Sequence, residues 1–154
     1  MKLRKVLMAA VVAVSLASIG AGLAQPGGKK AKTYRDGSVW EVQYIRVKPG
    51  MDDAYLSYLS GQWKSMQEAF KKDGLILSYK VITSEGHGVN DFNLMLMTEY
   101  KDLATMEANQ EKGETIAERV VGDEQKQQQG YKERSEIREI IASRLSREVV
   151  LEKK

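Results

Sequence analysis

The sequence predicts an α+β fold in which a four-stranded antiparallel sheet carries two helices on one face. Segments rich in β-branched and aromatic residues alternate with helical segments in the order strand, helix, strand, strand, helix, strand. Glycine, proline and asparagine separate several of these segments, as is typical of turns. The chain has no cysteine, so neither a disulfide nor a thiol contributes to its stability or its chemistry.

The first expected strand and helix are joined by a short turn. Residues 39–47 are rich in valine, isoleucine and aromatic side chains, which favour a strand. Lys48-Pro49-Gly50 ends this strand, because proline cannot donate a backbone hydrogen bond. A helix is expected over residues 51–73, because its apolar residues recur every three or four positions and share one face. These residues are Met51, Tyr55, Leu59, Trp63, Met66 and Phe70.

The next two strands are expected over residues 75–84 and 92–100, with a glycine-containing loop between them. The later strand is apolar on both faces, so both of its faces require cover. Asp102 is expected to cap a second helix that reaches Val121 and is interrupted near Gly113.

The C-terminal part of the sequence is ambiguous. Residues 124–130 are rich in glutamine and are expected to form a polar end after the second helix. Residues 135–154 fit a helix in one register and a strand in another. A strand over about residues 144–151 is favoured, because the three earlier strands require a fourth.

The resulting order is that of the split βαβ, or ferredoxin-like, arrangement. Its two helices cover one face of the sheet and leave the other face without cover. A second copy of the sheet is the simplest cover, so the sequence predicts a homodimer in which two sheets form an α/β barrel.

Two segments resemble the dimeric α/β-barrel superfamily. They are residues 42–50, VQYIRVKPG, and residues 97–103, MTEYKDL. The resemblance covers residues 39–152 in element order, and it extends to small exported bacterial proteins of unassigned activity. The superfamily includes antibiotic-biosynthesis-type monooxygenases, haem-degrading enzymes, and EthD-like, NIPSNAP-like and stress-response proteins. A shared fold does not choose among these activities.

The N-terminus has the three parts of a secretory signal peptide. A largely apolar run of about 14 residues follows the basic residues Lys2, Arg4 and Lys5. This run is too short to cross a bilayer. Small residues follow, and cleavage is predicted after Ala24. The domains are therefore a signal peptide (1–24), a flexible leader (25–38) and one ferredoxin-like domain (39–152). We expect a periplasmic or secreted protein without a stable membrane anchor after cleavage.

The net charge of +3 lies entirely in the predicted signal peptide. Residues 1–24 contain three basic residues and no acidic one, and the 21 basic residues that remain equal the 21 acidic ones. The neutral charge of residues 25–154 gives no support for a nucleic-acid partner, and neither does the lack of a phosphate-binding glycine loop or another recognised motif.

Six residues are candidates for a ligand site. Aromatic residues with polar tips suit the edge of a pocket. Polar residues on apolar strands either form an ion-pair network at the dimer interface, face solvent, or line a pocket, in that order of preference. His87, the only histidine, could be a general base or a haem ligand, although a glycine-bracketed loop favours an exposed, idle side chain. The candidates are Tyr44, Trp63, Tyr79, His87, Glu99 and Arg144.

The function therefore stays open among three hypotheses. The preferred hypothesis is an exported dimer that either binds a small, partly apolar ligand between its two sheets or has a non-catalytic role in the cell envelope. The second is a cofactor-independent monooxygenase-like enzyme. The third is a haem-binding protein, in which His87→Ala would abolish the Soret band if His87 were the ligand. No cofactor and no metal are expected, because no cluster of suitable ligands occurs in the sequence.

We predict that the exported protein begins at Gln25. The small residues before this position match the requirement of signal peptidase. Intact mass measurement of the protein from the periplasm or the medium should give the mass of residues 25–154. A chain that keeps residues 1–24 in either compartment would contradict the prediction.

Overall fold

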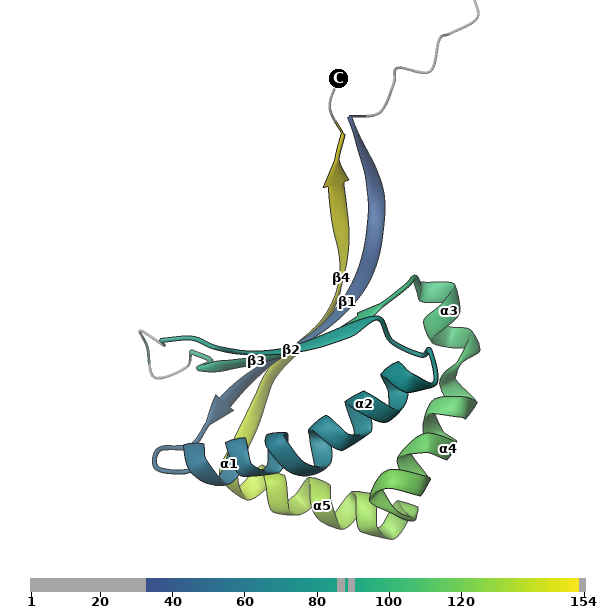
Figure 1. The fold of residues 1–154 in the computed structure, drawn as a ribbon. Helices are drawn as coiled ribbons and strands as arrows, with labels where there is room; N and C mark the ends of the chain where they lie inside the picture. Colours follow the sequence, from purple (N-terminus) through teal and green to yellow (C-terminus); the bar gives the residue numbers. More distant parts are fainter. Residues whose placement is uncertain (1–32, 86–87, 89–90, 153–154) are drawn as a thin grey trace, which may run out of the picture. The chain divides into compact units, whose positions relative to one another are not determined.

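The computed structural model describes residues 33–85, 88 and 91–152. Its sheet has the strand order β2-β3-β1-β4, and all neighbouring strands are antiparallel (Figure 1). β3 lies between the two strands of the first βαβ unit, and β1 lies between those of the second. This confirms the predicted ferredoxin-like fold. The strands are β1 (Tyr34–Val47), β2 (Ser78–Thr83), β3 (Leu94–Tyr100) and β4 (Arg138–Leu151).

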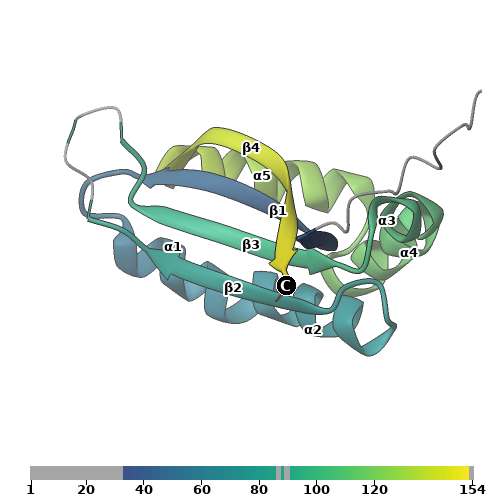
Figure 2. The ribbon, with the colours of Figure 1, turned by 90° about the horizontal axis from the view of Figure 1, so that it is seen from above.

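The helices lie on one face of the sheet, as Figures 1 and 2 show from two directions. The first helical segment begins after Met51, as predicted, but contains one π turn. The second helical segment breaks at Asn109 rather than near the expected Gly113, because the Asn109 backbone leaves helical geometry. The helices are α1 (Asp52–Tyr58), the π turn η1 (Leu59–Trp63), α2 (Lys64–Lys72), α3 (Leu103–Ala108), α4 (Gln110–Val121) and α5 (Glu124–Ile137).

Helix α5 was not predicted. Residues 124–130, expected to be a polar end, form its first two turns, and Asp123 caps it by accepting a hydrogen bond from the Lys126 backbone N–H at 2.9 Å. Its glutamate, glutamine and lysine residues favour a helix, but they have no apolar period that would reveal one. The helix ends at Ile137 and β4 starts at Arg138, which resolves the ambiguous tail.

Strand β1 begins five residues earlier than predicted. Residues 34–38, assigned to the flexible leader, belong to this strand, and Tyr34, Arg35 and Asp36 pair with the end of β4 in an arm that extends beyond the sheet (Figure 1). The register of the β1–β4 pairing shifts between Asp36 and Val39, and the two strands remain paired on either side of this irregularity. A Cβ atom at Gly37 would lie 2.9 Å from the Glu148 Cβ, so glycine is needed there. The signal peptide and the rest of the leader lie outside the described residues.

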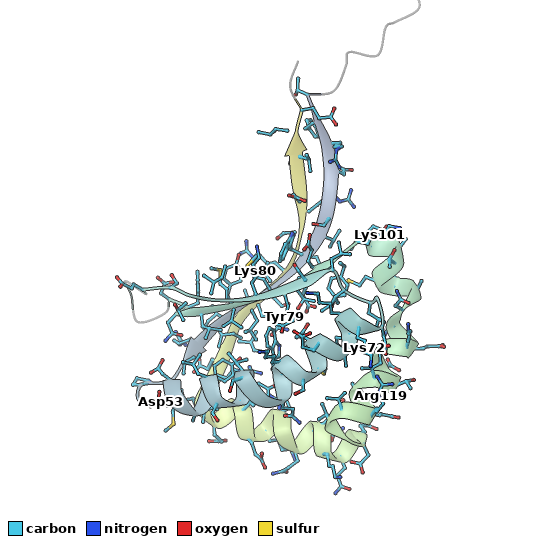
Figure 3. All side chains as sticks on the ribbon, in the orientation of Figure 1. Asp53, Lys72, Tyr79, Lys80, Lys101 and Arg119 are labelled. Carbon is cyan, nitrogen blue, oxygen red and sulfur yellow. The ribbon has the colours of Figure 1, made fainter. Side chains whose placement is uncertain are left out.

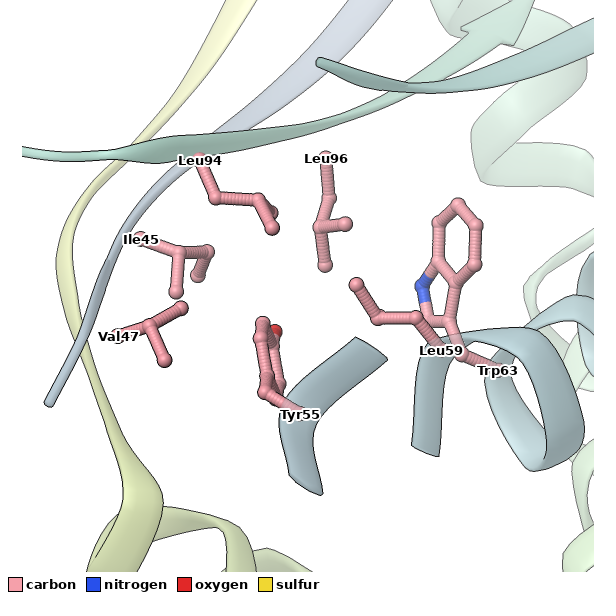
Figure 4. Close-up of a cluster of buried hydrophobic side chains, with 7 residues drawn as sticks. All are labelled: Ile45, Val47, Tyr55, Leu59, Trp63, Leu94 and Leu96. Atoms are coloured by element: carbon pink, nitrogen blue, oxygen red, sulfur yellow. The ribbon is translucent and has the colours of Figure 1, made fainter. Parts of the chain in front are cut away.

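The hydrophobic core joins the sheet to the helical segment from α1 to α2 (Figure 4). Ile45 and Tyr55 are completely buried at its centre. Burial of each large apolar side chain contributes about 1.5–3 kcal/mol to folding. A second cluster joins Leu75 and Ile76 to α4 through Ile116. The members of the first cluster are Ile45, Val47, Tyr55, Leu59, Trp63, Leu94 and Leu96.

The π turn η1 changes which helical residues face the sheet. Tyr55, Leu59, Trp63 and Gln67 are spaced four residues apart, and all are buried. In an α-helix, three such steps would rotate Gln67 by about 120° from Tyr55, because each step overshoots a turn by about 40°. The wider π turn takes up an extra residue and reverses most of this rotation. Gln67 therefore lies on the same buried side as Tyr55.

Candidate functional site

The structure divides the predicted site residues between the two faces of the sheet. Tyr44, Glu99 and Arg144 lie on the face without helices, which we call the open face. Tyr79 lies on the helix face and packs its ring edge-on against Trp63, with ring centroids 5.3 Å apart. Figure 3 shows the neighbouring residues Lys80 and Tyr79 on opposite sides of the sheet. The sixth candidate, His87, lies outside the described residues.

The open face combines aromatic rings with cationic side chains. The Arg144 guanidinium lies 6.0 Å from the Tyr44 ring centroid, and the Lys80 Nζ lies 5.1 Å from that of Trp40. Glu99 accepts a hydrogen bond from the Ser78 hydroxyl. The polar residues of this face therefore contact their neighbours and do not converge on one point.

A cavity of about 300 Å³ lies on the helix face instead. Its walls come from β1, β3, the segment from α1 to α2, α5 and the start of β4. Leu96, Phe70 and Trp63 provide apolar and aromatic wall, and Trp63 is the predicted site residue that lines it. Glu41 and Gln43, two polar residues of β1, also line it.

Three buried polar atoms in the cavity wall have no hydrogen-bond partner. They are the Tyr55 Oη, the Gln67 Oε1 and the Arg138 Nε. The residues are 0%, 5% and 8% exposed. Buried polar groups in folded proteins nearly always have partners, and an orphaned one costs about 1–3 kcal/mol. The meeting of three such atoms in one cavity wall makes this cavity the candidate functional site.

The charged groups of the wall differ in how well they are paired. Glu41 accepts hydrogen bonds from the Tyr100 hydroxyl at 3.3 Å and from the Gln43 side-chain amide at 3.5 Å. The Arg138 guanidinium lies 5.7 Å from the Tyr55 ring centroid and 6.0 Å from that of Tyr131. Cation–π contacts hold this arginine in place but leave its Nε–H without an acceptor.

Two phenols of the wall, Tyr55 and Tyr100, stay protonated well above neutral pH. Burial raises the pKa of Tyr55 to about 12, although the nearby Arg138 charge opposes the shift. Burial and the adjacent Glu41 carboxylate raise the pKa of Tyr100 to about 12. Both hydroxyls are therefore hydrogen-bond donors at physiological pH. They are poorly matched to general-base catalysis, which requires a pKa near the working pH.

The most important residues of the cavity wall were not among the predicted site residues. Tyr55 was assigned only to the core, and Gln67 did not fit the apolar period because the π turn could not be predicted. Arg138 belonged to the ambiguous tail. Its position among Ile137, Ile140 and Ile141 was the one available signal, because a charge in an apolar segment is often functional or paired.

The described residues offer neither a metal-binding cluster nor a membrane-spanning helix. Over the described ranges, no three histidine, aspartate or glutamate side chains come together in a way that could hold a metal ion. None of the described helices is long and apolar enough to cross a bilayer.

The chain matches no protein-family model and no curated protein sequence. Three solved structures are similar to it. HapK from Hahella chejuensis is 10% identical with a TM-score of 0.45, over 70% of this chain and 90% of that one. A NipSnap family protein of unknown function from Agrobacterium tumefaciens is 15% identical with a TM-score of 0.44, over 77% and 92%. A dimeric ferredoxin-like protein from an uncultured marine organism is 19% identical with a TM-score of 0.37, over 79% and 99%.

We predict that Tyr55→Phe makes the protein less sensitive to alkali. Below pH 10 the phenol is protonated in both the folded and the unfolded state. Between pH 10 and 12 only the unfolded state releases its proton, so wild-type stability falls by up to about 1.4 kcal/mol per pH unit through this group. Urea unfolding at pH 7, 10 and 11 measures the difference.

The matched control is Tyr34→Phe, which removes an exposed phenol from the arm. This variant should follow the wild-type pH dependence. A Tyr55→Phe protein that loses stability above pH 10 as steeply as the wild type would show that burial of Tyr55 does not control this response.

Proposed function

We propose that this protein binds a small, partly apolar molecule in the cavity between its sheet and its helices. The observation that carries the proposal is the meeting of three buried, unpartnered polar atoms in the wall of one cavity. A domain with a purely structural role would be more stable with apolar side chains at these positions. This cavity lies between the sheet and the helices of one chain, whereas the sequence analysis expected the ligand between the two sheets of a dimer.

Binding explains the wall better than catalysis does. The described wall residues contain no pair of groups with the hydrogen bond and the near-neutral pKa expected of a nucleophile and its base. Their polar atoms instead offer two donors and an acceptor, separated by aromatic surface. This pattern is typical of sites that orient a ligand.

We also propose that the exported chain forms a homodimer through the open face. Trp40, Met95 and Met97 are half-buried there, with no helix above them. A specific protein–protein interface buries roughly 800 Å² on each partner, and an aromatic centre with a polar rim suits such an interface. The ligand cavity lies on the other side of the sheet, so a dimer leaves it accessible.

We predict that protein purified from its natural host retains a small molecule. Mass spectrometry of the denatured protein should detect about one molecule per chain. Thr98→Leu adds bulk to the cavity wall from β3 and should reduce the retained amount at least tenfold. Thr83→Leu makes the same change at an exposed position on β2 and should retain the wild-type amount. An empty wild-type protein, or equal retention by both variants, would refute the proposal.

For the dimer, sedimentation of the wild-type chain at micromolar concentration should give twice the chain mass. Met97→Arg places a positive charge in the centre of the open face, directly opposite Lys80, and should give a monomer, because a desolvated, unpaired charge opposes association. Leu56→Arg adds the same charge on the outer side of α1 and should remain dimeric. A monomeric wild-type protein would rule out the dimer.

A further inference from the structure

We infer that the occupant of the cavity is an organic monoanion, most simply a carboxylate, and that its anionic group binds Arg138 and Tyr55. The inference rests on the proposed ligand-binding function and specifies the chemistry of its ligand. It follows from the charge of the wall, the geometry around Arg138 and the volume of the cavity.

The cavity wall has an excess of one positive charge. Its charged residues are Glu41, Arg134 and Arg138. Glu41 is already engaged with two neutral donors, Gln43 and Tyr100. Within the described ranges, neither arginine forms a salt bridge. A monoanion would make the occupied cavity neutral, whereas a dianion would leave it with an excess negative charge.

Arg138 is the more deeply buried of the two arginines. A buried arginine without a counter-ion is rare, because removing its charge from water is costly unless a partner compensates. The ring contacts with Tyr55 and Tyr131 compensate only part of this cost. The described residues around it supply no carboxylate, so the Arg138 Nε–H is open to an anionic group of a ligand.

The position of Arg138 is rigid. It is the first residue of β4, it pairs with Val47 of β1, and the Lys48 backbone N–H donates to the Ile137 carbonyl oxygen at 2.9 Å beside it. A guanidinium held in this way presents a planar set of donors that matches a carboxylate. The protonated Tyr55 hydroxyl provides a further donor at the same end of the cavity.

The rest of the ligand is apolar and small. Trp63, Phe70 and Leu96 line the remaining wall. A volume of about 300 Å³ corresponds to about ten water-sized groups, so about ten to twelve non-hydrogen atoms fit. The Gln67 Oε1, without a donor in the protein, can accept a hydrogen bond from a hydroxyl or amine of the ligand.

The test compares carboxylates with neutral amides of the same shape. Calorimetric titrations of the purified full chain use 4-phenylbutyrate and decanoate, each paired with its carboxamide, and benzyl phosphate as the dianion of matching size. The wild type should bind at least one carboxylate tenfold or more tightly than its amide, and should bind it more tightly than the phosphate.

Arg138→Met removes the charge and keeps much of the side-chain volume. It should abolish the preference for carboxylate over amide while the free protein becomes no less stable, since an uncompensated buried charge is lost. Arg119→Met, at a salt-bridged arginine on the exposed side of α4, should keep the wild-type preference (Figure 3). If Arg138→Met does not fold, Tyr55→Phe and Arg138→Lys replace it, and each should weaken carboxylate binding severalfold.

The outcomes distinguish the ligand-binding function from the inference that the ligand is a monoanion. Equal affinity for carboxylate and amide, tighter binding of the phosphate, or an unchanged preference in the Arg138 variants would refute the monoanion while leaving ligand binding intact. Failure of the wild type to bind any of the five probes at millimolar concentration would refute the monoanion. If, in addition, the host-purified protein retained no molecule, the ligand-binding function would fail as well.

Discussion

The antiparallel pairing of β1 with β4 determines where the rest of the molecule lies. Each strand has 14 residues, and their pairing runs from Val47–Arg138 at the helix end to Tyr34–Leu151 at the tip of the arm. β1 also pairs with β3, so one strand sets the register on both sides. A shift of one residue would exchange the residues of the open face for those facing the helices.

This register places a polar cavity beside an apolar core. At one end, Ile45, Val47 and Leu94 pack against Tyr55. Further along β1 and β3, Gln43, Glu41 and Thr98 replace apolar residues on the same face, and the helices do not fill the space above them. The interior therefore gives up part of the packing energy that apolar residues would contribute there. Natural proteins give up packing energy of this kind mainly at functional sites.

Much of the fold could be predicted from local patterns. The strands near Val42 and Leu96 and the helix around Tyr55 have clear periods, and the βαββαβ order follows from them. Helix α5 could not be predicted, because its sequence favours a helix without an apolar stripe. The arm at Tyr34 could not be predicted either, since its residues form a strand only by pairing with β4, more than a hundred positions later.

The candidate site was predicted only in small part. Trp63 was a predicted site residue, and it lines the cavity. Tyr44, Glu99 and Arg144 were grouped with it although they lie on the open face of the sheet. An alternating pattern tells which residues share a face within one strand, but it does not tell which face the helices cover.

Local sequence patterns alone thus indicate the βαββαβ order without α5, the neutral charge of residues 25–154 and the absence of disulfides. Tertiary structure decides which faces meet, because long-range pairing aligns strands whose residues are far apart in the chain. It also decides the role of Arg138. Only when α5 and β4 lie against the α1 segment does its guanidinium become buried between Tyr55 and Tyr131, without a carboxylate partner. A side chain acquires such an environment from packing, and no local pattern encodes it.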